Sequence, residues 1–336
     1  MNIVFLIGNG FDISLGLKTS YRDFAKYYVQ KPSSHPSIEK LKKEIEECLK
    51  EENKDDNKWS DFELAFGEYT KNLSGEQEFD IVYDDILMMM QAYLLEEKAR
   101  FDKDLQRYSL NIANVLNSLA RPDSFLREER RFSRLFQKTD TININIINFN
   151  YTTTIDDFIK EISWNYLNRD GAIIKVGNVH HIHGTLDKTM LFGVNDPSQI
   201  ANTAFQNSSI ISSEFVKPNF NQRLGYGVDE VCMRLIKNAD LICVYGMSIG
   251  DTDRCWWEYI CESLKNVNHY AIVFHWSEKR FSPIQERLQI REEERVKANF
   301  LKKAGLDIDS PISRSIFIGY NTAIFQNIWE EGKVTK

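Results

Sequence analysis

Two histidines in the middle of the chain have the type and spacing of catalytic groups. His181 and His183 are separated by one residue and directly precede Gly184. Alternate residues of a strand face the same side, so we expect the two imidazoles to share a face. An unperturbed imidazole titrates near pH ~6.5, and His183, at the predicted strand end, therefore suits a general base. A structural role is the alternative for His180 and His181, and the sequence names no further ligands for a metal.

Two asparagines close an isoleucine-rich stretch upstream of the histidines. Asn148 and Asn150 lie two residues apart at the end of residues 141–150, where isoleucines alternate with polar residues. Such alternation is typical of a strand. An amide at a strand end can orient a ribose hydroxyl or a water, and Asn150 is our candidate for this role. Turn formation by asparagine is the equally weighted alternative.

A glycine-containing turn follows the first apolar run, Asn2–Ile7. Glycines between a strand and a helix allow backbone N–H groups to approach an anion, so we expect this turn to contact a nucleotide. The third glycine of the GxGxxG fingerprint is absent, because position 13 is Ile13. Asp12, next in the chain, is a candidate for stabilising positive charge. The candidate binding residues of the turn are Gly8, Asn9, Gly10 and Phe11.

A second turn of this kind follows the apolar run at residues 239–245. Gly246 and Ser248 have the types that could hold a ribose or a phosphate. Asp251 is a further binding candidate, although Asp251 and Asp253 also suit the start of a helix, where aspartates cap free N–H groups.

The surrounding elements predict an α/β protein with a Rossmann-like, mostly parallel sheet, because strand patterns alternate with helical ones. In such sheets ligands bind beyond the carboxyl ends of the strands. A long, charge-rich helical region interrupts the pattern, and its Met88-Met89-Met90 run is interpreted as core filler. We expect a core of residues 1–29 and 139–336 and a helical insertion of residues 30–138. The predicted strands are 2–7, 141–150, 176–183, 191–193, 239–245 and 270–276, and the predicted helices are 155–164, 219–238, 253–265 and 283–303.

Charge, hydropathy and cysteine content argue against a nucleic-acid partner, a membrane span and a zinc site. The net charge of −7 over 336 residues argues against a nucleic-acid partner, which would require many basic residues on phosphates. No apolar run approaches the ~20 residues of a membrane span, and the N-terminus lacks a signal-peptide pattern. Five cysteines without a CxxC pair favour reduced thiols and no zinc site. We therefore expect a cytoplasmic protein.

The four motifs, in this order and each ending a strand, resemble those of the AbiH abortive-infection family of bacterial anti-phage proteins. The resemblance is carried by residues 7–24, 148–152, 181–186 and 245–253. The same order is similar to the wider sirtuin-like NAD-binding group. That resemblance implies a Rossmann-like domain that binds or cleaves NAD. In it, His183 matches the catalytic histidine and Asn150 the asparagine. Gly8 and Gly10 match its first turn, and Gly246 and Ser248 its last.

Three functions remain open. The first is an NAD glycohydrolase, favoured over protein deacylation because the four-cysteine zinc module of deacylating sirtuins is absent. There His183 would accept a proton, Asn150 would orient the ribose or a water, and Asp12 would stabilise developing positive charge. The second is a nucleotide-binding sensor or assembly protein without turnover. The third is a metal-dependent hydrolase that uses the histidines with nearby aspartates. The partner expected in every case is a small molecule, with self-association or another defence protein as further possibilities.

Overall fold

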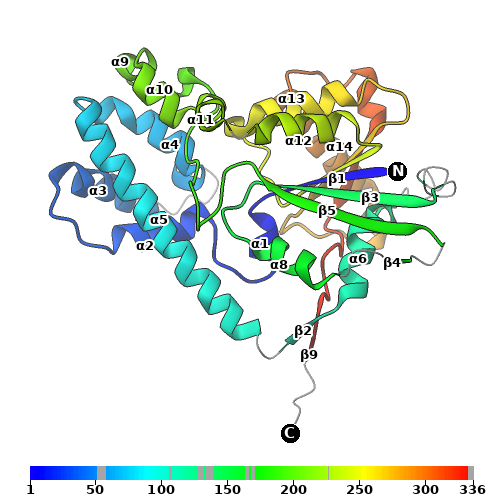
Figure 1. Ribbon diagram of the computed structural model, residues 1–336. Coiled ribbons are helices and arrows are strands. Elements are labelled where there is room, and N and C mark those ends of the chain that lie inside the picture. The colour runs from blue at the N-terminus through cyan, green and yellow to red at the C-terminus, as the bar shows by residue number, and fades with distance from the viewer. Residues whose placement is uncertain are drawn as a thin grey trace, which may run out of the picture.

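The structure is a computed structural model of the chain (Figure 1). The residues that it describes are 1–50, 58–105, 108–127, 132, 136, 139–162, 166–167, 171–225 and 227–331.

A seven-stranded sheet forms the centre of the molecule, in the order β4-β5-β3-β1-β6-β7-β8. All neighbouring strands are parallel except β4, which pairs antiparallel with β5 at one edge. Numbered along the chain, the six parallel strands have the order 3-2-1-4-5-6 of doubly wound nucleotide-binding folds. The Rossmann-like prediction is confirmed. The strands are β1 (Asn2–Ile7), β3 (Thr141–Asn148), β4 (Tyr166–Leu167), β5 (Ile173–His181), β6 (Leu241–Tyr245), β7 (Tyr270–His275) and β8 (Ile316–Tyr320).

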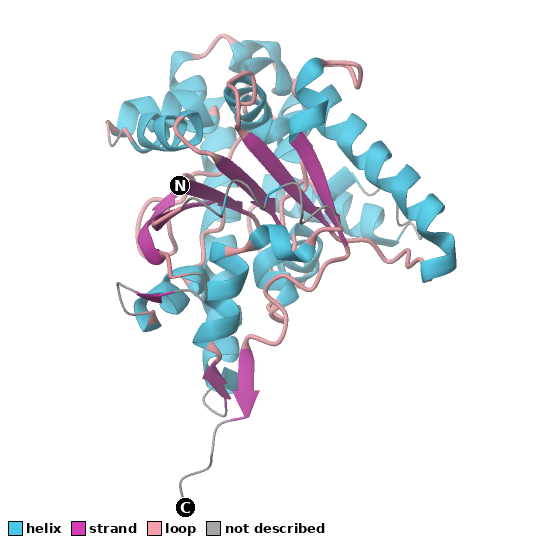
Figure 2. Cartoon of the chain, turned by 90° about the vertical axis from the view of Figure 1, so that its right-hand side faces the viewer, coloured by secondary structure: helices cyan, strands magenta, loops and turns pink. Residues whose placement is uncertain are grey.

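Helices cover both faces of this sheet, as Figures 1 and 2 show. Strand β1 is buried on both sides: Phe5 faces one apolar cluster and Leu6 faces the other. Burial on both faces is why this strand is continuously apolar rather than alternating. The first cluster includes α1 (Gly10–Ser14), α6 (Ile112–Ala120) and α8 (Thr154–Glu161), and the second includes α12 (Val228–Lys237), α13 (Arg254–Ser263) and α14 (Glu286–Lys303).

A separate helical group lies beside the sheet (left in Figure 1) and has its own aromatic core. Phe66 and Phe79, from the first half of the chain, pack edge-on against Phe215. Two distant segments therefore build this group together. Its helices are α2 (Tyr21–Val29), α3 (Pro36–Lys50), α4 (Phe62–Tyr69), α5 (Glu76–Leu105), α9 (Thr203–Gln206), α10 (Ser209–Phe215) and α11 (Lys217–Leu224).

The remaining elements are short. Strand β2 (Tyr108–Leu110) pairs antiparallel with β9 (Trp329–Glu331), so the chain after α5 returns beside the C-terminal segment. The division into residues 1–29 with 139–336 and residues 30–138 stays a prediction. The 3-10 helices are Lys58–Ser60, Thr70–Asn72, Pro122–Phe125, Pro197–Gln199, Asp251–Asp253, Pro283–Gln285 and Pro311–Ser315.

Three local predictions were wrong in whole or in part. Residues 219–238 hold a helix, α12, as predicted, but they also hold most of α11, which ends at Gly225 in a left-handed conformation, and Gly227 precedes α12. Residues 191–193 form no strand and are flanked by single bridges such as Val194 with Val216. The methionine run is core filler only in part, because Met90 is buried and Met89 packs against the same core, whereas Met88 is 64% exposed. Among the described helices, none has the length and apolar composition needed to cross a membrane.

Candidate functional site

A cavity of about 1080 Å³ opens beyond the carboxyl ends of the strands. It extends to residues of the helical group, among them Tyr21, Asp61 and Glu63. Its volume is at the upper end of the ~300–1,000 Å³ typical of ligand sites. The crevice at the β1/β6 strand-order reversal is where doubly wound folds bind ligands. Residues that follow the strands and line the cavity include Gly8, Asn9, Gly10, Phe149, Asn150, Tyr151, Thr152, His183, Gly246, Met247, Ser248, Trp276, Asn321 and Thr322.

The two glycine turns cross one another at the base of this cavity. The N–H of Gly8 donates to the carbonyl of Tyr245 at 2.9 Å, and that of Gly10 donates to the carbonyl of Gly246 at 2.7 Å. A Cβ on Gly10 would lie 2.6 Å from the Gly246 Cα. Gly246 also has a φ of 67°, a conformation that favours glycine. The glycines are thus required where the two loops cross, and phosphate contact by this turn stays a prediction.

The other nucleotide candidates of the first turn have different surroundings. Asn9 lines the cavity, and its Nδ2 donates to the Thr19 carbonyl at 2.8 Å, which ties the turn to the following loop. The Phe11 side chain is fully buried instead and packs edge-on against Phe158 and Phe325. Phe11 is therefore a core residue whose packing holds the turn against the sheet.

The candidate residues of the second turn also differ in whether they line the cavity. Ser248 lines the cavity, whereas Asp251 does not. The Asp251 side chain is 50% exposed and forms an ion pair with Lys303 at 2.7 Å. It therefore faces solvent at the start of α13.

Asn150 and Asp12 both line the cavity. The Nδ2 of Asn150 donates to the Gly8 carbonyl at 3.1 Å, and its backbone N–H donates to the Asn148 Oδ1 at 2.9 Å. Asp12 is 1% exposed and accepts a hydrogen bond from the Thr152 hydroxyl through Oδ2. Its Oδ1 has no hydrogen-bond partner among the residues described. Burial raises the pKa of Asp12 to about 6, against the opposing effects of the Thr152 hydroxyl, the Thr154 hydroxyl and the Lys98 charge.

The His183 imidazole belongs to a buried chain of charged side chains. Its Nε2 lies 3.4 Å from Asp253 Oδ1, which in turn lies 3.3 Å from the Lys217 Nζ. The same Nζ lies 2.6 Å from Glu63 Oε2. Glu63 comes from α4, Lys217 from α11, and Asp253 from the segment before α13. This series of charged side chains therefore links the sheet to the helical group.

Burial and neighbouring charges have opposing effects on the pKa values of these buried side chains. Burial lowers the pKa of His183, as does the Lys217 charge, while Asp253 opposes both. Burial also disfavours the ammonium of Lys217, but Asp253 and Glu63 outweigh it and raise its pKa. For Asp253, burial is outweighed by Lys217 and His183, and the pKa is lowered. At neutral pH this arrangement favours a neutral imidazole beside an ionised carboxylate, which suits proton acceptance.

Glu63 and Lys217 are functional candidates that sequence reasoning missed, and Asp253 was considered only as a helix cap or a metal ligand. For Glu63 and Lys217 the sequence did contain an indication of burial. Glu63 stands within the apolar segment FELAFG, and Lys217 follows the apolar Phe215-Val216. A charged residue within an apolar stretch has to find a buried partner, but the sequence does not say which one.

The expectation that His181 and His183 share a face was wrong. Strand β5 ends at His181, so the alternation does not continue to His183. The Nε2 of His181 lies 3.0 Å from Asp156 Oδ2 on α8, whereas His183 packs edge-on against Phe149. Throughout the described part of the chain, no group of three or more His, Cys, Asp or Glu side chains is arranged to hold a metal ion.

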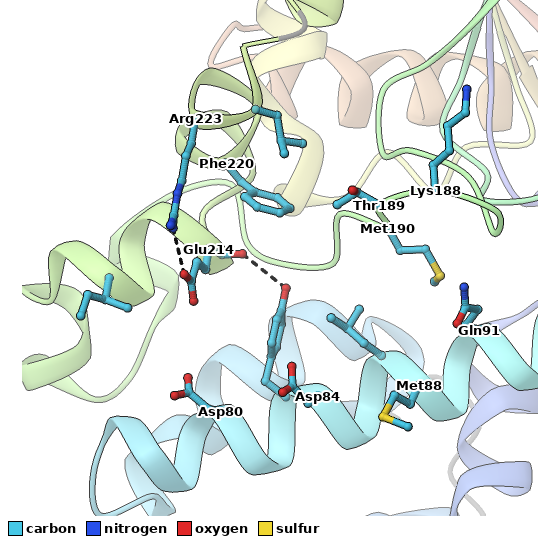
Figure 3. A pocket seen from close by; sticks show the side chains of 14 residues that line it. Asp80, Asp84, Met88, Gln91, Lys188, Thr189, Met190, Glu214, Phe220 and Arg223 are labelled. Atoms are coloured by element: carbon cyan, nitrogen blue, oxygen red, sulfur yellow. Dashed lines mark hydrogen bonds and ion pairs between the residues drawn. The ribbon is translucent and has the colours of Figure 1, made fainter.

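A second hollow, of about 800 Å³ and more open, lies between α5, α10 and α11 (Figure 3). Its wall includes the Arg223–Glu214 ion pair at 2.8 Å and Tyr83, whose hydroxyl donates to the Glu214 carbonyl at 3.3 Å. It shares no lining residue with the first cavity and contains none of the predicted site residues.

Comparison with known proteins identifies the family. A family model described as bacteriophage abortive infection AbiH matches residues 4–276, which is more than half of the chain. The matched range contains both glycine turns, Asn150, His183 and the buried charged chain. A search among curated proteins found no match.

Proposed function

The chain belongs to the bacteriophage abortive infection AbiH family, and we propose that it acts by hydrolysing NAD at the N-glycosidic bond. Membership indicates a function in abortive infection. The enzymatic step is our proposal, and one observation carries it. His183, held by Asp253, lines the same cavity as Asn150, at the strand-order reversal of a Rossmann-like sheet. Loss of NAD would stop the metabolism of an infected cell.

The proposed chemistry breaks the bond between the nicotinamide nitrogen and the ribose. Water adds to the anomeric carbon, the C–N bond breaks, and nicotinamide leaves as a neutral molecule with the bonding electron pair. The second product is ADP-ribose, and one proton of the attacking water is released. His183 would accept that proton through its imidazole, because burial lowers its pKa and leaves the ring unprotonated at physiological pH.

The transition state of this reaction has oxocarbenium character, so positive charge develops on the ribose. Asp12 supplies a buried carboxylate in the cavity wall, with one oxygen that has no partner among the described residues. A fixed carboxylate in a site of low dielectric stabilises such charge strongly. Asn150 would orient the ribose or the water, since it lines the same cavity and its amide is anchored to Gly8.

The direct test is the conversion of NAD by the purified protein, with nicotinamide and ADP-ribose measured by chromatography and mass spectrometry. We expect His183→Ala and Asn150→Ala to abolish the conversion. The matched control is His269→Ala, because His269 contacts Ser263 at 3.2 Å and does not line the cavity. The same variants should lose defence against phage. The proposal fails if NAD stays intact in infected cells that carry the wild type while the two site variants still defend them.

Binding without turnover is the second candidate, and one observation favours it. The Asn150 amide and the His183 ring are already engaged by Gly8 and Asp253, so either could serve to shape the cavity rather than to react. Tight binding of NAD in calorimetry, with no product after prolonged incubation in infected-cell extract, would support a sensor.

A further inference from the structure

The main cavity has an unusual balance of charge for a nucleotide site. Among the described residues that line it there is no Lys and no Arg. Lys217 lies behind the wall, where it pairs with Glu63 and Asp253. The lining contains four carboxyl groups, those of Asp12, Asp61, Glu63 and Asp253. Lys217 acts on the last three, and the more distant charge of Lys98 acts on Asp12.

Three of these carboxylates, those of Asp61, Glu63 and Asp253, form an acidic group. Glu63 and Asp253 are near each other because they approach the same Lys217 Nζ, at 2.6 Å and 3.3 Å. Burial raises the pKa of Asp61, and the charges of Asp253 and Asp251 add to the effect. Burial likewise raises the pKa of Glu63, where Asp253 and Asp61 act against the attraction of Lys217. Lys217 therefore compensates these carboxylates only in part, and burial together with their mutual repulsion drives Asp61 and Glu63 towards the protonated form. A positive group brought into this part of the cavity would relieve the repulsion.

Asp12 provides an independent observation in the same cavity. Its side chain is almost fully buried, and its Oδ1 has no hydrogen-bond partner among the described residues. An unsatisfied buried carboxylate oxygen is costly. A ligand that supplies a positive charge or a donor at this place would remove that cost. The arrangement lacks the side-chain geometry of a metal site in the part of the chain described, so the fitting group is an organic cation.

We infer that the cavity selects ligands whose group beside His183 carries a positive charge, namely pyridinium ribosides. The inference rests on the proposed function and specifies its substrate class. The neutral dihydropyridine of NADH would gain nothing from the carboxylates. The tips of β7 and β8 contribute Trp276, Asn321 and Thr322 without any carboxylate. The adenosine and its phosphates would therefore extend towards this uncharged end.

Charge selection can be measured without turnover. The first pair of probes is carba-NAD, a non-hydrolysable analogue that keeps the pyridinium, and NADH. The second pair is 1-methylnicotinamide, a cation, and neutral nicotinamide. We expect calorimetry at pH 7.5 to give at least ten-fold tighter binding of the cationic member of each pair. Opposite charges a few ångströms apart in a partly desolvated site account for such a factor.

Variants separate charge from shape. Asp12→Asn and Glu63→Gln keep the size of the side chain and remove its charge, and each should reduce the preference for the cation several-fold. Asp309→Asn is the matched control, because Asp309 is exposed and does not line the cavity. Thermal unfolding of each variant without ligand shows whether it is folded before binding is compared.

The outcomes distinguish this inference from the proposal on which it rests. If carba-NAD and NADH bind equally well, charge selection is wrong while a dinucleotide site remains. If neither dinucleotide binds but 1-methylnicotinamide still exceeds nicotinamide, the cation site stands and NAD hydrolysis is refuted. If neither pair shows a preference, or the preference survives in both site variants, charge selection is overturned.

Discussion

The buried carboxyl group of Asp12 should make the stability of the protein depend on pH in a measurable way. Burial raises its pKa from 3.8 to about 6. When the native pKa of an acid is the higher one, the unfolded chain loses its proton first as pH rises. Stability from this group therefore falls between about pH 4 and pH 6 and stays low above it. A difference of about two pKa units corresponds to about 3 kcal/mol at neutral pH.

The substitution Asp12→Asn removes this dependence, because an amide does not titrate. By linkage, the wild type has lost about 1 kcal/mol at pH 4.5 and about 3 kcal/mol at pH 7.5. The free energy of unfolding of the variant, relative to the wild type, should thus be about 2 kcal/mol higher at pH 7.5 than at pH 4.5. Effects of the amide that do not depend on pH cancel in this comparison.

Urea denaturation followed by tryptophan fluorescence at the two pH values gives the four free energies that are needed. Asp309→Asn, at an exposed position, is the matched control and should give the same difference at both values. The reasoning is refuted if the difference between Asp12→Asn and the wild type does not change with pH, because Asp12 would then be ionised with the same ease in the folded and unfolded states.

Two further predictions concern the packing of the site. Lys217→Met should lower the free energy of unfolding by ~3–5 kcal/mol in urea denaturation, because it leaves Glu63 and Asp253 buried without their cation. The double variant with Glu63→Gln should recover part of this loss, and equal stability of the single and double variants would contradict the coupling. Gly10→Ala should cost ~1–3 kcal/mol, since its Cβ would lie 2.6 Å from the Gly246 Cα. Gly75→Ala, where a Cβ meets no atom within 4 Å, is its control, and similar melting temperatures for the two variants would show that the crossing of the loops tolerates a side chain.

Local signals were sufficient for most of the sheet. Strand β1 is the predicted segment Asn2–Ile7, and the predicted strand 141–150 overlaps β3. A short, β-branched apolar run that stops at a glycine or a polar residue favours a strand, because it has the length of a strand and is shorter than a typical helix. The polar residues at the ends of these strands could likewise be recognised, since all parallel strands end at one edge of the sheet.

The partners of the site residues depend on contacts far apart in the sequence. Lys217 and Glu63 are 154 residues apart, and no local pattern relates an apolar segment of α4 to the start of α11. The role of the glycines was also hidden, because only the crossing of two loops shows that Gly10 has to approach Gly246. The orientation of His183 was decided by the end of β5 at His181, two residues before the end of the predicted strand, and an alternating pattern does not reveal where pairing stops.

By itself the sequence determined the α/β class, the positions of the strand ends and the residue types gathered there, because these follow from short-range periodicity and from backbone preferences. Only the tertiary structure decided which of these side chains share a cavity, and that Phe11 and Asp251 face elsewhere. It also decided that the helical group adds Glu63 to the buried series of charges that reaches the imidazole through Lys217 and Asp253. The physical reason is that burial and charge pairing are properties of the folded neighbourhood. A carboxylate has the same chemistry in any sequence, and its pKa and its partners depend on what packs around it.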